Sequence, residues 1–298
     1  MEYHNPVLLN ETVDGLDIKP NGIYVDVTFG GGGHSKEILN RLGPDGKLFG
    51  FDQDEDAFEN ALADERFVLI PENFRYIKRF LRFHGVKSVD GILADLGVSS
   101  HQFDVPERGF STRFDAQLDM RMSRKNELDA FKVVNEYDET NLRRVFFDYG
   151  ELKNAPALSR TIIEARALNP IQKTDELKAT LSRFLPAHSS NKILAQIYQA
   201  IRIEVNQEMD ALKEFLEQSL EILKPEGRLS VISYHSLEDR LVKRFMKNGL
   251  FDGEPERDFF GNFSVPFKLV GKLIVPNDAE IKINNRARSA KLRIAEKK

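Results

Sequence analysis

The sequence predicts an α/β protein with a doubly wound, mostly parallel β-sheet and an inserted all-α domain. Three short apolar segments, at 23–28, 47–51 and 90–94, are rich in β-branched or aromatic residues and bounded by turn formers, which favours buried strands. A helical pattern at 35–42 separates the first two. Strands that alternate with helices imply parallel pairing through right-handed crossovers.

The alternation stops near residue 107, where helical patterns take over. We expect them at 139–149, 157–167 and 175–184, followed by a long helix over 192–223. We therefore predict a discontinuous cofactor-binding domain, 1–106 and 200–298, and a helical insertion, 107–199. The other expected elements are a helix at 54–63, strands at 67–70, 228–233, 265–269 and 290–295, and a helix at 236–248.

Composition excludes several classes of protein. The 298 residues carry 43 basic and 47 acidic side chains, a net charge of −4, so any site for a polyanion must be a local patch. The lack of cysteine excludes disulfides, thiolate metal sites and a catalytic thiol. The six histidines have no metal-ligand spacing, so no metal site is predicted. Without an apolar run long enough to span a bilayer or an N-terminal secretory signal, we expect a cytoplasmic protein with no membrane partner.

A run of four glycines, Gly30–Gly33, links the first strand to the next helix. Glycine allows positive φ and close approach of a ligand to the backbone, and a helix N-terminus offers free N–H groups. The spacing fits neither G-x-G-x-x-G nor a P-loop. Asp52 follows about 20 residues later at a strand end, where an acid accepts hydrogen bonds from an adenosine ribose. A merely structural turn is the alternative.

Three acidic residues are expected at the carboxyl ends of neighbouring strands, where doubly wound sheets bind ligands. They are Asp26, Asp52 and Asp95. Such a group repels a dinucleotide diphosphate and suits a cofactor with sulfonium and ammonium groups, since a charge pair 4 Å apart interacts by roughly 4 kcal/mol at an effective dielectric of about 20. S-adenosylmethionine is therefore favoured over NAD. For each carboxylate, the alternative is that it caps a loop.

Several strings spread over nearly the whole chain are specific rather than generic. They are His4–Leu8, Asp26–Ser35, Asp90–Ser100, Arg108–Ser111, Leu118–Met122, Gln199–Asn206, Ser233–Arg240 and Asn285–Ser289. Together they resemble the motifs of the small-subunit ribosomal RNA (cytosine-N4)-methyltransferases, the MraW family. Two positions depart from that pattern, because Gly31 replaces an often charged residue and Tyr234 replaces the usual Phe. The region 249–280 diverges, so nothing is carried over there.

The resemblance implies a Rossmann-like class I methyltransferase fold. It also implies methyl transfer from S-adenosylmethionine to the exocyclic amine of one cytidine in the decoding region of 16S ribosomal RNA. The helical insertion would then recognise the substrate, either naked RNA or the assembled small subunit; no oligomeric state follows. The implied cofactor contacts are Gly32, Gly33, His34, Asp52, Phe74, Asp95 and Gln102.

The chemistry of an amine methyltransferase selects the candidate catalytic residues. Methylation of cytosine carbon-5 normally needs a cysteine adduct, which this chain cannot form. Amine methylation needs in-line positioning and a proton acceptor. The usual Asp/Asn/Ser-Pro-Pro-aromatic tetrapeptide is absent, and Asp95 begins the string in its place, so we expect Asp95 to accept a hydrogen bond from cofactor, amine or both. Asn206 and His235 are further candidates.

Each candidate substrate contact has a plain structural alternative. Phe110 and Phe103 either shelter a flipped base or pack at the domain junction. Arg202 and Asn206 share a helical face and either reach substrate or form a buried pair. Ser236 and Asp239 match a capping box. The remaining basic residues either bind phosphate or are simply solvated: Arg240, Lys243, Arg244, Lys247, Arg286, Arg288, Lys291, Arg293, Lys297 and Lys298.

Two other functions are compatible with these patterns. One is an amino-methyltransferase that acts on another nucleic acid or on nucleotides. The other is a non-catalytic protein that binds S-adenosylmethionine and assists ribosome assembly.

Overall fold

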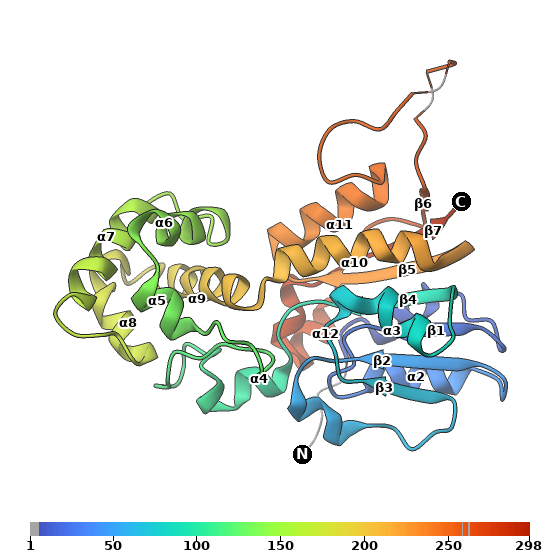
Figure 1. Cartoon of the computed structure of the whole chain (residues 1–298), viewed down its shortest axis with the longest axis horizontal. Coiled ribbons are helices and arrows are strands. Elements are labelled where there is room, and N and C mark those ends of the chain that lie inside the picture. Colours follow the sequence, from blue (N-terminus) through green and yellow to red (C-terminus); the bar gives the residue numbers. More distant parts are fainter. Residues whose placement is uncertain (1–5, 258, 262) are drawn as a thin grey trace. The chain divides into compact units, whose positions relative to one another are not determined.

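The computed structural model describes residues 6–257, 259–261 and 263–298 (Figure 1). His4 and Asn5 of the N-terminal motif lie outside the described residues. The chain divides into two compact units, an α/β unit (Met1–Gly97 and Met209–Lys298) and a helical unit (Val98–Glu208). Within the described ranges, no helix combines the length and apolarity needed to cross a membrane.

The boundaries between the units differ from the predicted ones by nine residues on each side, 97 against 106 and 208 against 199. The reason is α9 (Ser190–Asn206), because the predicted domain boundary between residues 199 and 200 falls inside this helix. Its apolar face, including Ile197, Ile201 and Val205, is buried in the core of the helical unit. The whole helix therefore belongs to that unit.

The α/β unit contains a seven-stranded sheet in the order β3-β2-β1-β4-β5-β7-β6. All its pairs are parallel except those made by β7, which is antiparallel to both neighbours. This confirms the doubly wound, mostly parallel sheet predicted from the sequence. The strands are β1 (Ile23–Asp26), β2 (Lys47–Phe51), β3 (Phe67–Ile70), β4 (Val89–Asp95), β5 (Leu223–Ser233), β6 (Phe267–Leu269) and β7 (Lys291–Lys297).

Successive side chains of the strands enter two different cores because side chains alternate along a strand. Val25 and Phe49 pack with one set of helices, α3 (Ile77–Phe83), α10 (Glu208–Ile222) and α11 (Ser236–Asn248). Tyr24 and Leu48 pack with the other set, α1 (Leu9–Asp14) and α2 (Gly33–Arg41). Helices therefore cover both faces of the sheet. The unit also contains α12 (Asp278–Ile283) and the 3₁₀ helices η1 (Glu55–Asn60), η2 (Phe74–Tyr76) and η5 (Asn285–Ser289).

The helical unit has its own core, built from the apolar faces of several helices. The helices predicted at 139–149 and 157–167 are confirmed as α6 and α7. The predicted 175–184 helix is divided into α8 and η4. The elements are α4 (Ser100–Asp104), η3 (Pro106–Arg108), α5 (Ala130–Glu136), α6 (Glu139–Asp148), α7 (Ala155–Arg166), α8 (Thr174–Thr180), η4 (Ser182–Phe184) and α9.

Two other predicted helices were wrong. The single helix over 192–223 is broken at Gln207, whose left-handed φ of 50° ends α9 before α10 begins. The helix expected at 54–63 is only the 3₁₀ helix η1, which begins with the Asp54 side chain accepting a hydrogen bond from the Asp56 N–H. In both places the apolar residues have helical spacing, but the backbone does not continue as an α-helix.

Candidate active site at the carboxyl edge of the sheet

The glycine loop between β1 and α2 uses conformations and contacts that side chains would disturb. Gly30 and Gly32 have φ values of 51° and 74°. A Cβ at Gly32 would lie 3.0 Å from the Phe29 ring, and one at Gly33 would lie 2.1 Å from Cγ of Pro6. Among the described side chains, none caps the N-terminus of α2. Its N–H groups are therefore available to a ligand's acceptor atoms.

Asp52 and Asn60 hold this loop from the neighbouring segment. The Gly30 N–H donates to Oδ2 of Asp52 (2.8 Å), and Nδ2 of Asn60 donates to the Gly30 carbonyl (3.0 Å). Burial raises the pKa of Asp52 to about 6, although N–H donors from Asp54 and Gly30 oppose that shift. Asp52 thus lies beside the loop at the end of β2, as predicted. Its contact with a ribose stays a prediction.

Asp26 does not line a ligand site, contrary to the sequence prediction. Its side chain is only 1% exposed and accepts hydrogen bonds from Ser35 Oγ (2.7 Å) and the Thr28 N–H (3.1 Å). Burial raises its pKa to about 6, with these donors opposing the shift. Asp26 therefore caps the loop after β1 and ties the Ser35 side chain of α2 to that strand, which is the alternative weighed for it.

Asp95 ends β4 and is held on two sides. Its N–H donates to Oγ1 of Thr28 (2.7 Å), and its Oδ1 accepts from the Tyr234 hydroxyl (2.7 Å). The side chain remains 23% exposed. Burial raises the pKa of Asp95 to about 6, while His34 and Tyr234 oppose the shift. A carboxylate with one oxygen fixed and partial access to solvent suits the role of an acceptor.

The role of Tyr234 is not among the sequence predictions. Tyr234 follows β5, which pairs with β4, so its position just past the register partner of Asp95 was a usable signal. The departure from Phe at this position supplies the hydroxyl that reaches the carboxylate.

His34 faces Asp95 with an unprotonated nitrogen. Its Nε2 lies 3.1 Å from the Val7 carbonyl, which can only accept, so Nε2 carries the proton. Burial lowers the pKa of His34, with Asp95 opposing the shift, so the ring is neutral. Nδ1 then presents a lone pair 3.9 Å from Oδ2 of Asp95. Two acceptors that face each other favour a ligand carrying N–H donors or positive charge.

Phe74 lies in η2, directly after β3. Its ring makes an edge contact with Phe215, with centroids 5.3 Å apart. Asn73 fixes this turn, because its Oδ1 accepts from the Arg75 N–H (2.9 Å) while its Nδ2 donates to Gln53 (2.8 Å). Gln53 follows Asp52, so the segments after β2 and β3 are joined and Phe74 is held in place.

Two predicted site residues of the helical unit have local partners. The Gln102 side chain forms a capping box at the start of α4 with Ser99, through two hydrogen bonds of 3.1 Å. Phe110 is 4% exposed and belongs to the helical core, which is a packing role. Their contacts with cofactor and substrate stay predictions.

Asn206 and Arg202 are also engaged within the helical unit. Asn206 accepts from the Met122 N–H (2.7 Å) and donates to the carbonyls of Met120 (2.8 Å) and Arg202 (2.9 Å). The Arg202 guanidinium makes two hydrogen bonds of 2.8 Å to Glu208. The two side chains therefore hold separate partners, and Asn206 fastens the 120–122 segment to α9.

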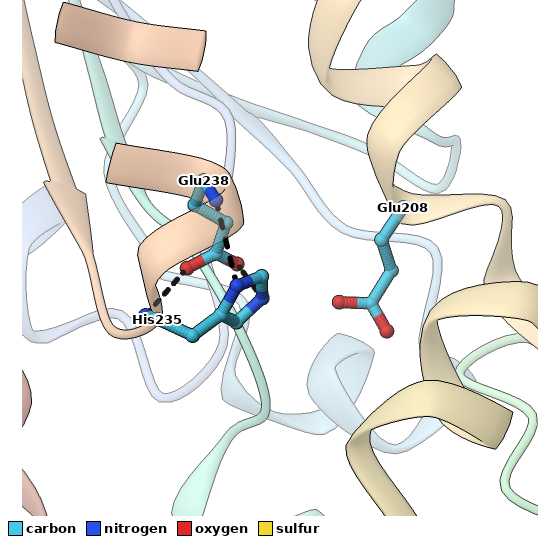
Figure 2. A group of neighbouring side chains, drawn as sticks. All are labelled: Glu208, His235 and Glu238. Carbon is cyan, nitrogen blue, oxygen red and sulfur yellow. Dashed lines mark hydrogen bonds and ion pairs between the residues drawn. The ribbon is translucent and has the colours of Figure 1, made fainter. Parts of the chain in front are cut away.

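His235 caps α11 with its own side chain (Figure 2). Its Nδ1 accepts from the Glu238 N–H (3.4 Å), and Oε2 of Glu238 accepts from the His235 N–H (3.3 Å). Nε2 of His235 lies 3.2 Å from Oε1 of Glu238 without making a hydrogen bond among the described residues. The capping box predicted at Ser236 and Asp239 was thus wrong by one residue, because Asp239 pairs with Lys291 and Arg293 instead.

Several of the basic residues predicted to bind phosphate instead make hydrogen bonds or ion pairs within the α/β unit. Lys291 and Arg293 on β7 bind Asp239 on α11 at 3.1 and 2.8 Å. Lys297 donates to the carbonyls of Leu220 in α10 and Leu223 in β5, and Arg244 donates to the Gly253 carbonyl. These four basic residues are therefore weaker candidates for phosphate binding than the sequence suggests. Arg240, Lys243, Lys247, Arg288 and Lys298 remain exposed, and Arg286 is partly buried.

The sheet order with an antiparallel β7, together with a glycine loop and two acidic residues beside the switch point, defines a class I methyltransferase fold. The whole chain, residues 1–298, matches the MraW methylase family. The protein belongs to this family, so the resemblance found in its motifs is confirmed. Membership of a methylase family supports S-adenosylmethionine, rather than a nicotinamide dinucleotide, as its cofactor.

Relatives that are similar in sequence agree with this membership, and a solved structure is similar to the chain over its whole length. A Flavobacterium johnsoniae protein named "Ribosomal RNA small subunit methyltransferase H" is 82% identical, and the match covers 100% of this chain and 98% of the relative. A protein of the same name from Cytophaga hutchinsonii is 57% identical over 99% of both chains. The solved structure of an rRNA methylase from Streptococcus thermophilus is 14% identical, with a TM-score of 0.44 and coverage of 100% of this chain and 98% of that chain.

Proposed function

We propose that this protein transfers a methyl group from S-adenosylmethionine to the N4 amine of a cytidine in the decoding region of small-subunit ribosomal RNA. The names of its relatives support the RNA substrate, and the sequence motifs support the N4 position and the decoding region. The observation that carries the proposal is the facing pair of acceptors, Nδ1 of His34 and Oδ2 of Asp95. We further propose that the helical unit recognises the RNA, in the cytoplasm where ribosomes are assembled.

The residues at this edge of the sheet fit the proposed cofactor. When bound, S-adenosylmethionine supplies an electrophilic methyl group. Asp52 offers its carboxylate to ribose hydroxyls, and Gly32 and Gly33 let the loop backbone approach the ligand. Phe74 offers an apolar ring held by its neighbours. The ionised carboxylates attract a cationic ligand and repel the diphosphate of NAD.

Asp95 is the residue that we assign to the proton of the amine. The N4 nitrogen forms a bond to the methyl carbon while the carbon–sulfur bond breaks, and it sheds one proton. Tyr234 holds Oδ1 of Asp95, so Oδ2 is the oxygen left to accept that proton or a hydrogen bond from the amine. A pKa of about 6 leaves Asp95 ionised at neutral pH. We assign positioning roles to Asn206 and His235, because their side chains hold backbone N–H groups.

The product of the reaction tests the proposal. The purified protein, with methyl-labelled S-adenosylmethionine, is offered assembled small subunits, naked small-subunit RNA or duplex DNA, each lacking the modification. We expect label in ribosomal RNA, recovered as N4-methylcytidine after digestion to nucleosides. Label in 5-methylcytidine, or in DNA alone, would contradict the proposal. Calorimetry that detects NAD binding but no S-adenosylmethionine binding would also contradict it.

Substituting Tyr234 by Phe should change the pH dependence of methyl transfer. The activity needs ionised Asp95, so it is present above a pH of about 6 and is lost as the pH falls through that value. The Tyr234 hydroxyl favours the ionised form, so its removal raises the pKa of Asp95 further. We expect the acid limb of the rate profile to move to higher pH, by roughly half a unit to one unit. The rate at pH 8 should change less than about fivefold.

Single-turnover rates from pH 5 to pH 9 measure this effect. Tyr24→Phe is the matched control, since the Tyr24 hydroxyl accepts a hydrogen bond from the Lys19 N–H (2.7 Å) at the amino-terminal end of β1, the end opposite the candidate site. If the acid limb of the Tyr234→Phe variant does not move, the Tyr234 hydroxyl does not influence the pKa of Asp95.

A further inference from the structure

Apart from Phe74 and the Asn73 side chain that holds its turn, a basic and aromatic segment of the α/β unit has no role in the chemistry described above. Residues 73–89 contain five basic side chains and no acidic one, in a chain whose net charge is −4. They form η2, α3 and the turn that follows (Figure 1). The basic residues are Arg75, Lys78, Arg79, Arg82 and Lys87.

Ion pairs with α10 neutralise only one side of this segment. Arg75 donates to Glu214 (2.9 Å), and Lys78 pairs with Glu221. Arg79, Arg82 and Lys87 are exposed, and none of them makes an ion pair with a residue that the structure describes. Three positive charges are therefore left facing solvent within nine residues.

Aromatic rings lie exposed among these charges. The Phe83 side chain is 83% exposed and Tyr76 is 43% exposed. Tyr76 precedes α3, while Arg79, Arg82 and Phe83 are three or four residues apart within it, so these three share one face of α3. The Phe83 ring makes a T-shaped contact with the His84 ring, with centroids 5.4 Å apart. An exposed aromatic ring contributes little to the stability of the fold. Proteins that bind single-stranded RNA use such rings to stack on unpaired bases, while neighbouring arginines bind the phosphates.

We propose that this surface, made of Arg79, Arg82, Phe83 and Lys87, binds ribosomal RNA outside the site of methyl transfer. The proposal rests on the function proposed above. The three cations contact phosphates, and Phe83 stacks on an unpaired base. An anionic lipid surface is disfavoured, because a seven-residue helix with one strongly exposed ring lacks the broad apolar face of a membrane-binding helix.

Substitutions on α3 test this surface in the full-length protein. The variants are Arg79→Ala with Arg82→Ala, and Phe83→Ala. The control is Lys19→Ala with Lys47→Ala, which removes the same charge from exposed positions of the same unit. The readouts are KM and kcat for small-subunit particles, the Kd of S-adenosylmethionine, and the salt dependence of RNA binding.

We expect KM to rise about tenfold in each α3 variant, with kcat and the Kd of S-adenosylmethionine unchanged. The arginine variant should also lower the slope of log affinity against log salt by about 1.5, since each lost phosphate contact removes about 0.7–0.9. Phe83→Ala should leave that slope unchanged, because stacking releases no counterion. The control should match the wild type.

Distinct results separate the possible failures. If the wild type does not methylate small-subunit RNA, the proposed function fails. If the wild type is active and the α3 variants match it, or if the control weakens binding equally, the α3 surface is not an RNA site. Flotation of the wild type with phosphatidylserine vesicles, lost in the arginine variant while KM for particles stays unchanged, would assign the surface to lipid and overturn the inference.

Discussion

Replacing Asp95 by asparagine should lower the single-turnover rate of methyl transfer by about 100-fold or more, the usual contribution of a proton acceptor. The amide keeps an oxygen for the Tyr234 hydroxyl but turns an NH₂ group, a donor, toward the reacting amine. The Asp95→Asn variant should also lose the acid limb near pH 6 from its residual rate, since that limb comes from the pKa of Asp95. The rate is measured at saturating cofactor, so weaker binding does not mimic slower chemistry.

The fold of this variant should survive, and its thermal midpoint at pH 8 should be unchanged or higher. Burial raises the pKa of Asp95 to about 6 in the folded chain, so folding favours the protonated form. The resulting penalty exists above that pH and disappears as the pH falls toward the ordinary value of 3.8. A neutral amide removes the penalty and can donate to Nδ1 of His34.

Asp45→Asn is the matched control, because Asp45 is exposed in the turn before β2. It should leave rate, pH profile and midpoint unchanged. A near-wild-type single-turnover rate in Asp95→Asn would show that Asp95 does not accept the proton.

Replacing Asn206 by alanine should destabilise the helical unit by about 2–4 kcal/mol. The Asn206 side chain is 4% exposed and makes three hydrogen bonds, so its loss removes the acceptor of the Met122 N–H and a donor to the Met120 carbonyl. Buried groups left unpaired cost about 1–3 kcal/mol each. Urea unfolding, together with hydrogen exchange of peptides from 116–134 and 194–206, measures this effect.

Asn191→Ala supplies the control on the same helix, because Asn191 is exposed and should change stability by less than about 0.5 kcal/mol. The comparison also decides between two roles for Asn206. A positioning residue loses stability together with activity. If Asn206→Ala unfolds like the wild type and yet loses turnover, Asn206 acts in the chemistry, as the sequence first suggested.

Local patterns predicted the elements whose signals are complete within a few residues. The strands β1, β2 and β4 are short apolar runs that end in turn formers, and α11 has the predicted bounds of 236–248. Apolar periodicity continued through Gln207, so it could not reveal the left-handed residue that separates α9 from α10. Apolar periodicity also could not place the domain boundary, because the core that a helix joins depends on which apolar faces pack together.

The sequence likewise predicted part of the candidate site, and the tertiary contacts decided the rest. Asp52 and Asp95 were placed beside the glycine loop because a parallel sheet brings strand ends to one edge. Asp26 had the same sequence signal, but Ser35 and Thr28 cover it, and burial sets it apart from the other two. The contact of Asp95 with Tyr234 joins residues 139 apart in the sequence.

The sequence alone determined the doubly wound fold, the MraW family and the strand-end acidic residues, because these depend on residue types and their order along the chain. Tertiary structure decided which carboxylate stays accessible, which nitrogen of His34 carries the proton and which cations are left unpaired. Those properties depend on burial and on partners from distant segments, such as the Val7 carbonyl that fixes the His34 ring. No local pattern encodes them.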